Sequence, residues 1–437
     1  MKSSGYSKLQ LPDFRGAAAR GPAERPTVPI DTLVLFLVVT LVMLGLIVVY
    51  AATMHRGMSF LFSQGIRAAI GLVVLIISSQ FPHPVLGGKL RWLLLGASIV
   101  LLVVTLGLGF ALGDAKRWIG NDSFSIQPAE LGKLALLIWL AGWFARQKEL
   151  GRDHTFRYSL LIPGIVVLAV VGLTLAQPAI GTSFIMAASA LAMFFIAGVR
   201  LRYVLFTIGI VVVIFVLAIT FIDYPRQRWQ KFTGGERYHQ EQSLIAIGSG
   251  GPLGKGLGEG KQKFFFLPKM HNDFIFAEIG EEFGFLGSLV VYLLYGLLFL
   301  RGMRISRDCS GQFGHNLAGG IATMLLLYAI VHVAVTLGRI PTTGQPLPFV
   351  SYGGSALVTN LLAAGILLNI SRYKRNSALS ADMPWQSKSP SFATSGAIKP
   401  RPRIQLSAGA GFTGGVTAPG AARAHWSPGA GVGGRKS

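Results

Sequence analysis

One carboxylate in the sequence has the surroundings of a proton acceptor. Asp273 lies within an aromatic stretch, 264–276, and His271 stands two positions before it. An apolar surrounding and a neighbouring cation both change how readily a carboxylate takes up a proton. Asp273 could therefore act as a catalytic base, anchor a divalent ion, or serve a structural purpose alone.

Further ionisable residues lie within apolar stretches, where their burial is costly and therefore suggests a function. Glu130 and Lys133 are spaced i, i+3, so they share a helix face and can pair. Such a pair could also do no more than hold helices together. Arg67 could reach a polar cavity or extend to the lipid headgroups. His332 could be a ligand, although packing is the commoner use of such a histidine.

A glycine-rich segment, 248–260, has the composition of a phosphate-binding loop but lacks the motif. Ser249 and Gly256 occupy the positions where a P-loop requires Gly and then Ser or Thr. The exposed N–H groups of this segment, together with Lys255, could still bind an anion. A flexible connector is the alternative.

The composition places these residues in a membrane protein. The 437 residues are 51% hydrophobic and 13% charged, whereas soluble chains carry about 25% charged residues. A soluble enzyme and a disordered scaffold are thereby excluded. The formal net charge of +22 must lie mostly in loops and tails, so no nucleic-acid partner is expected. The single cysteine, Cys309, excludes an intramolecular disulfide and a cysteine-based metal site.

Ten stretches approach the roughly 20 apolar residues that a membrane-spanning helix needs. The fourth is short, and 177–181 alone separates the fifth from the sixth. The sequence therefore predicts an all-α polytopic membrane protein. The predicted spans are 32–52, 60–80, 92–111, 130–144, 158–176, 182–198, 203–222, 274–300, 317–338 and 352–371.

Loop charges predict how these spans are oriented, because cytosolic loops carry an excess of Lys and Arg. Basic residues are concentrated in the N-terminal tail, in alternate short loops and after the tenth span. Both termini are therefore expected in the cytosol, with the long loop 223–273 outside. The ionisable residues of the spans then fall in the outer half of the bilayer, which predicts a polar cavity open to the outer face.

Two tails flank the membrane domain, which we expect over 31–373. Residues 1–30 form the cytosolic N-terminal tail. Residues 374–437 are basic and rich in Gly, Ala, Ser and Pro, a composition typical of disorder.

Three collinear blocks carry a recognisable pattern. They are Lys116-Arg117-Trp118 followed by Gln127-Pro128-Ala129-Glu130 and Lys133; Pro268-Lys269-Met270-His271-Asn272-Asp273-Phe274-Ile275-Phe276 leading into Gly280-Glu281-Glu282; and Pro341 to Ser355, which includes Leu347-Pro348-Phe349-Val350-Ser351-Tyr352-Gly353-Gly354. With these blocks the chain resembles the SEDS family of peptidoglycan polymerases, which includes FtsW, RodA and SpoVE. The third block is most similar to the FtsW-like division members.

The resemblance implies inverting glycosyl transfer on the outer face of the bacterial cytoplasmic membrane, at the division septum. The implied substrate is lipid II, an undecaprenyl-pyrophosphate disaccharide-pentapeptide, and Asp273 would deprotonate the acceptor hydroxyl. A divalent cation, Mg or Mn, could offset charge on the pyrophosphate, with Asp273 as its candidate anchor. The residues implied to bind substrate are Arg67, Arg117, Glu130, Lys133, Lys255, His271, Ser351, Gly353 and Gly354.

The resemblance also implies partners. A class B penicillin-binding protein would supply cross-linking, and other membrane proteins of the divisome would join the complex. Two alternatives are a lipid II flippase and a catalytically inert division scaffold. Four positions depart from the family pattern and leave open a change of partners or reduced activity: Ala179, Lys269, Asn272 and His332.

Overall fold

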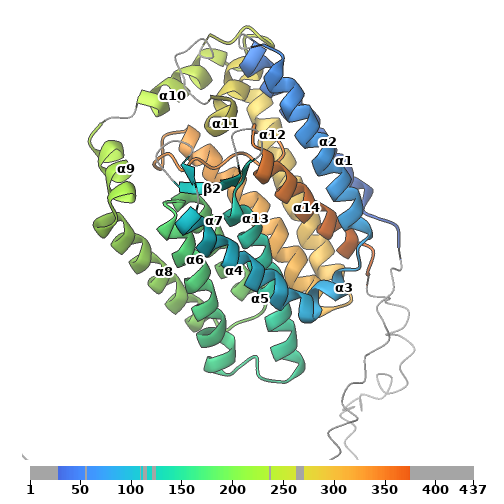
Figure 1. Cartoon of the computed structure of the whole chain (residues 1–437). Coiled ribbons are helices and arrows are strands. Elements are labelled where there is room, and N and C mark those ends of the chain that lie inside the picture. Colours follow the sequence, from blue (N-terminus) through green and yellow to red (C-terminus); the bar gives the residue numbers. More distant parts are fainter. Residues whose placement is uncertain are drawn as a thin grey trace, which may run out of the picture. The chain divides into compact units, whose positions relative to one another are not determined.

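The computed structural model describes residues 28–54, 57–108, 110–111, 116–120, 125–235, 238–261 and 270–374. The predicted tails therefore lie almost wholly outside the described residues, and so does Lys269. Within the described part of the chain, helices run in two senses through a bundle. Figure 1 shows α10 and α11 at one end of this bundle and α3 at the other.

All ten predicted spans are helical. With their preceding short turns, eight are long and apolar enough to cross a membrane in the described residues, whereas α7 and α14 are apolar but have 17 residues each. The all-α polytopic prediction is confirmed, and the side of the membrane that each terminus occupies stays a prediction. The main helices are α1 Thr32–Thr53, α2 Ser59–Gln80, α4 Arg91–Leu108, α5 Pro128–Glu149, α6 Ile162–Ala176, α7 Ile180–Ile196, α8 Leu201–Phe221, α12 Ile275–Asp308, α13 Gln312–Thr336 and α14 Gly354–Ile370. The short elements before α4 and α6 are α3 His83–Val85, the π-helical turn η2 Leu86–Leu90 and the π-helical turn η3 Arg157–Leu161.

Helices α5 and α13 form the inside of the bundle. They are the most buried of the long apolar helices, and α13 contacts α5, α7, α12 and α14. By contrast, α8 is apolar around its whole circumference and mostly exposed. A helix with that pattern is stable when lipid or another apolar surface covers it. Polar side chains that function inside the bundle must therefore come from α5, α13 and their neighbours.

Helix α5 has end signals that explain its length of 22 residues, longer than the predicted span. Pro128 occupies the start, where a missing N–H costs nothing. Glu130 lies in the first turn, and Arg146 and Lys148 lie in the last. The acid near the N-terminus and the bases near the C-terminus both interact favourably with the helix dipole. These ends place Glu130 and Lys133 in the first turns of a fixed helix.

An ion pair joins the start of α1 to the end of α12. The side chain of Asp31 accepts a hydrogen bond from the Val34 N–H at 3.1 Å and so caps α1. Its other oxygen lies 2.7 Å from a guanidinium nitrogen of Arg301. The Asp31 N–H donates to Ser371 Oγ at 3.0 Å, just beyond α14. The first and last membrane helices thus meet at one end.

The predicted loop 223–273 contains three helices. They are α9 Asp223–Thr233, α10 Tyr238–Gly250 and α11 Met270–Asp273. In α10 the buried residues recur every three or four positions, which gives one face to pack against α12. Two side chains of that face, Gln240 and Ser243, donate to the Ile340 and Thr336 carbonyls at 2.8 and 2.9 Å.

A small antiparallel sheet lies between α4 and α5. Its strands are β1 Phe110–Ala111, β2 Lys116–Gly120 and β3 Ser125–Ile126, in the order β1-β2-β3. Trp118 pairs with Phe110, and Ile119 pairs with Ile126. The sheet falls partly within the third predicted span, 92–111, which therefore ends as helix at Leu108.

The segment that leads into α14 packs inside the bundle. Phe349 is buried and has a positive φ of 68°, which is unusual for a residue with a side chain. The Tyr295 hydroxyl of α12 donates to the Pro348 carbonyl. On α1, a Cβ at Gly45 would lie 2.7 Å from the Phe349 carbonyl oxygen, so only glycine permits this approach.

Candidate active site

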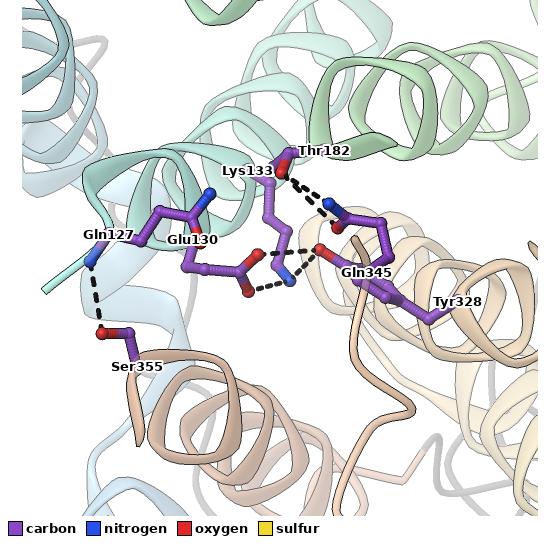
Figure 2. A network of polar contacts seen from close by, with 7 residues as sticks. All are labelled: Gln127, Glu130, Lys133, Thr182, Tyr328, Gln345 and Ser355. Carbon is purple, nitrogen blue, oxygen red and sulfur yellow. Dashed lines mark hydrogen bonds and ion pairs between the residues drawn. The ribbon is translucent and has the colours of Figure 1, made fainter. Parts of the chain in front are cut away.

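The sequence-predicted pair of Glu130 and Lys133 forms, and Tyr328 of α13 closes it into a network (Figure 2). Lys133 Nζ lies 2.6 Å from Glu130 Oε2 and donates to the Tyr328 hydroxyl at 2.5 Å. That hydroxyl donates in turn to Glu130 Oε1 at 3.1 Å. Glu130 and Lys133 are each 1% exposed. Opposite charges with these partners satisfy one another, and the network joins α5 to α13.

A second set of contacts holds the segment before α14 against α7 and α13. Gln345 exchanges hydrogen bonds with Thr182 of α7 at 3.1 and 3.4 Å (Figure 2). The Gln345 carbonyl lies 2.9 Å from His332 Nδ1 on α13. His332 is buried, which agrees with a packing residue that positions this segment. Gly181 permits the close approach, because a Cβ there would meet Thr343 and Gln345 at less than 3 Å.

Helices α5 and α14 also meet where they begin. The Gln127 N–H donates to Ser355 Oγ at 3.2 Å, as Figure 2 shows. Gln127 is buried, and Ser355 lies in the first turn of α14. The buried ion pair and the start of α14 are therefore parts of one connected arrangement.

Arg67 of α2 lies at the start of α14. Its guanidinium carbon stands 4.7 Å from the centroid of the Tyr352 ring, in the geometry of a cation–π contact. A Cβ at Gly354 would lie 3.2 Å from Arg67 Nε, so the side chain passes directly over this glycine. The first N–H groups of a helix have no acceptor within it and carry partial positive charge. Arg67 and the N-terminus of α14 thus form an electropositive corner that can bind an anion.

Asp273 ends α11, which approaches this corner. Its neighbour Asn272 approaches Gly353, because a Cβ there would be 3.9 Å from Asn272 Oδ1. Phe274 breaks the helix with φ −130° and packs, 3% exposed, on Ala246 and Val335. The buried ring fixes the chain, while Asp273 itself stays partly exposed. The guanidinium of Arg67 and the N-terminus of α14 therefore meet, and α11 approaches them through Asn272, the residue before Asp273.

The glycine-rich segment forms backbone hydrogen bonds with α12 on both sides of a break in that helix. Gly284 breaks α12 with φ 69°. The Lys255 and Gly256 N–H groups donate to the Glu281 and Glu282 carbonyls before that break, each at 3.0 Å. After it, the Phe285 and Leu286 N–H groups donate to the carbonyls of 251 and 252 at 2.9 and 3.1 Å.

The carboxylates of α12 also bind the glycine-rich segment. Lys255 Nζ lies 2.8 Å from Glu281 Oε1, which the Lys261 N–H also reaches at 2.8 Å. The Gly258 N–H donates to Glu282 Oε1 at 3.0 Å. These donors already have acceptors within the protein, so the geometry supports a structural use of the segment over an anion cradle.

The remaining predicted residues divide into two groups. Ser351 is buried, and its Oγ accepts a hydrogen bond from the Leu347 N–H at 2.8 Å, so it shapes the segment before α14. Arg117 lies on β2 and His271 on α11, but their side chains are outside the described residues. Among the residues that the structure describes, no three of His, Cys, Asp and Glu gather as a metal site would require. A divalent ion at Asp273 stays a prediction.

Three contributors to the site were not predicted from the sequence. Tyr328, Thr182 and Gln345 are uncharged and lie in unremarkable apolar or loop segments. Tyr328 did carry a signal, because it stands one helical turn before His332 and so shares its face. Gln345 lies within the third sequence block. Thr182 ends the stretch Gln177-Pro178-Ala179-Ile180-Gly181-Thr182, in which Ala179 departs from the family pattern.

The fold and the site together define a polytopic helical membrane protein with a polar centre where α5, α11 and α14 begin or end. Residues 31–376 match the family described as "Cell cycle protein", which comprises FtsW, RodA and SpoVE. The chain belongs to this family, and the resemblance seen in the three blocks is confirmed.

Curated relatives agree with this assignment. A probable peptidoglycan glycosyltransferase FtsW of Geobacter metallireducens is 36% identical, over 78% of this chain and 94% of the relative. The stage V sporulation protein E of Bacillus subtilis is 34% identical, over 79% and 98%.

Solved structures share the fold. The crystal structure of the rod shape determining protein RodA of Thermus thermophilus is 29% identical with a TM-score of 0.62, covering 79% of this chain and 98% of that one. A chain from a peptidoglycan synthase complex, whose structure is described as coordinating polymerization and crosslinking, is 28% identical with a TM-score of 0.66, covering 79% and 99%.

Proposed function

We propose that this protein is a peptidoglycan glycosyltransferase that polymerises lipid II on the outer face of the cytoplasmic membrane. The observation that carries the proposal is the electropositive corner of Arg67 and the N-terminus of α14, which Asn272, the neighbour of Asp273, approaches. A carboxylate beside an electropositive corner suits a reaction in which a hydroxyl attacks and a pyrophosphate departs. The names of the relatives and the membership of the family agree with this chemistry.

The reaction follows from these groups. The donor's pyrophosphate binds at Arg67 and the N–H groups of α14, which stabilise its negative charge. Asp273 takes the proton of the acceptor hydroxyl as that oxygen bonds to the anomeric carbon of the donor. The bond from this carbon to the pyrophosphate oxygen breaks with inversion, and the lipid pyrophosphate leaves. General-base help of this kind contributes about 10²–10⁴ in rate.

The buried network of Glu130, Lys133 and Tyr328 positions this site without touching substrate. It fixes α5 against α13, and Gln127 on α5 bonds the first turn of α14. A shift of the network would therefore move the N–H groups that receive the pyrophosphate. In this proposal Glu130 and Lys133 are positioning residues, as their 1% exposure favours.

The proposal includes an orientation and a partner. Both termini face the cytosol, and the segment 223–273 faces outward, where lipid II is polymerised at the septum. A class B penicillin-binding protein cross-links the product, in keeping with the solved synthase complex that coordinates polymerization with crosslinking. Reporter fusions within 238–250 test the orientation, and a cytosolic signal there would contradict it.

Polymerisation by the purified protein tests the central proposal. The full chain, alone and with its transpeptidase partner, is incubated with lipid II, and glycan strands are separated by length. We expect strands in at least the paired reaction. A folded complex that produces none acts as a scaffold, and one that moves lipid II across vesicles without polymer is a flippase. Thermal unfolding of the same sample establishes that the protein is folded.

A further inference from the structure

A second polar site lies at the opposite end of the bundle from Asp273. A cavity of about 530 Å³ opens between the start of α4, the end of α5 and the start of α13. Figure 1 places α3, which borders it, far from α11. The proposed reaction uses none of its residues. It is therefore a separate feature that needs its own explanation.

The cavity is electropositive. Lys89, Arg91 and Arg146 line it, against one carboxylate, Glu149. Glu149 lies 3.0 Å from Arg146 and so neutralises one of the three cations. His83, also in the lining, has its Nδ1 3.1 Å from Asn369 Oδ1 and is buried. Two positive charges, those of Lys89 and Arg91, thus remain without an acid in the lining.

Arg91 is held so that it faces this space. Its side chain lies over Gly142 of α5, where a Cβ would be 2.6 Å from Nη1 and 2.8 Å from Cδ. Its Nε is buried, and no described residue accepts a hydrogen bond from it. A buried donor without an acceptor is costly. A ligand would reach Nε only if the side chain shifted, whereas the Arg91 side chain as a whole is half-buried and lines the cavity. Arginine is well suited to a phosphate, which accepts several hydrogen bonds from one guanidinium.

The backbone beside Arg91 leaves space for the same ligand. Gly88 departs from helical geometry, with φ −79° and ψ −142°, which separates α3 from α4. The π-helical turn η2 continues directly into α4, and the Arg91 N–H already donates to the Lys89 carbonyl, so the side chains rather than the helix start supply the positive charge here. Gly88 leaves room for a ligand to approach the backbone, because a Cβ there would meet nothing within 4 Å, whereas the Phe313 ring lies over Gly87.

Tryptophans place the cavity at the membrane surface. Trp92 forms part of its wall and makes an edge contact with Trp139, at 5.4 Å between ring centroids. Trp143 stacks on Trp139 at 5.3 Å. Tryptophan gathers where headgroups meet the hydrocarbon. Because α4 is mostly exposed along its length, this wall borders the lipid.

We propose that this cavity binds a phosphate-bearing anion, namely the headgroup phosphate of an anionic phospholipid. Arg91 and Lys89 contact the phosphate, and Trp92 packs against the glycerol and upper acyl chain. A soluble phosphate shares this chemistry but would not need the tryptophan wall. The site would link the lipid composition of the leaflet to the packing of α4, α5 and α13.

Lipid binding to purified, delipidated full-length protein tests the proposal. Phosphatidylglycerol and phosphatidylcholine with equal acyl chains are titrated, and native mass spectrometry counts bound lipid. Inorganic phosphate and pyrophosphate form a separate arm, followed by thermal unfolding. We expect phosphatidylglycerol to bind preferentially, and Lys89→Gln/Arg91→Gln to weaken it about tenfold, as expected when a charged hydrogen bond is lost.

Two further variants keep the test decisive. Gly142→Ala removes no charge but displaces the Arg91 guanidinium, so it should also weaken phosphatidylglycerol binding. Arg200→Gln/Arg202→Gln removes two exposed charges that do not line the cavity and should leave this binding unchanged. If inorganic phosphate raises the thermal stability of the parent protein but not of the cavity variants, and neither lipid binds preferentially, the cavity is a phosphate site whose ligand is a soluble phosphate rather than a lipid. Equal affinity for both lipids without a phosphate effect, or equal loss in the control, would overturn the proposal.

Discussion

The Glu130–Lys133–Tyr328 network and the corner around the start of α14 lie close in the fold but differ in exposure. The network is at most 1% exposed, and its polar groups bond to one another. By contrast, Arg67, Asp273 and Gly354 are all partly exposed. Charged groups that are already paired and hydrogen-bonded inside the protein are not available to bind a substrate. In the proposed function, the buried charges therefore position the site, while the partly exposed groups carry out the chemistry.

The substitution Asp273→Asn is the most direct test of whether the partly exposed groups carry out the chemistry. The amide keeps the size of the side chain but cannot accept the proton, so polymerisation should fall by about 10²–10⁴. Thermal stability should change little, because the residue is partly exposed. Glycan product and thermal unfolding are measured on the same sample. Near-normal glycan synthesis would remove Asp273 from the chemistry.

Removing one member of the buried pair should act mainly on stability. Lys133→Met leaves the Glu130 carboxylate buried without its cation, at a cost of about 3–5 kcal/mol in the free energy of unfolding. The double variant Glu130→Gln/Lys133→Met should recover part of this loss, because no uncompensated charge remains. Denaturant unfolding in detergent measures both. A single variant as stable as the parent would show that the network is not structural.

The substitution Lys255→Ala distinguishes a structural role of the glycine-rich segment from a role in anion binding. Glu281 keeps the Lys261 N–H, and Lys255 is 28% exposed, so we expect a loss of about 1–2 kcal/mol in stability. The KM for lipid II should be unchanged, because the lysine does not reach the substrate. A raised KM at normal stability would restore the anion-binding hypothesis for the glycine-rich segment.

The smallest effect is expected at the aromatic partner of Arg67. Tyr352→Leu removes a cation–π contact of about 0.5–1 kcal/mol, so the KM for lipid II should rise two- to fivefold. Tyr352→Phe keeps the aromatic face and serves as the matched control. Equal effects of the two substitutions would mean that the hydroxyl, and not the ring, supports Arg67.

Much of the fold could be predicted because membrane helices are recognisable in a sequence by their length and hydropathy. All ten spans were located to within a few residues at most ends. The helix α10 within the predicted outer loop was missed, because its pattern of buried Gln, Ser, Ala and Gly resembles a loop composition. Sheet β1-β2-β3 was missed for a similar reason, since its strands of two to five residues carry no periodicity.

The candidate site was predictable where charge marks a residue and unpredictable where tertiary contact does. Glu130 and Lys133 were paired correctly from their spacing alone. The acceptor of Lys255 was not, since Glu281 is 26 residues away and meets it through the break at Gly284. Tyr328 and Gln345 acquire their roles from neighbours on other helices, and a single sequence does not contain that information.

The length of α14 determines how a tethered reactant would reach the corner. Seventeen residues rise about 26 Å, less than the roughly 30 Å of a hydrocarbon core, so the segment 341–353 must complete the crossing. The N-terminus of α14 then stops short of the membrane surface, at the depth of the lipid chains. In the proposed reaction, the polyprenyl chain of lipid II would then stay among the membrane lipids throughout a catalytic cycle. Arrival and departure would be lateral diffusion in two dimensions, with no extraction of the chain into water.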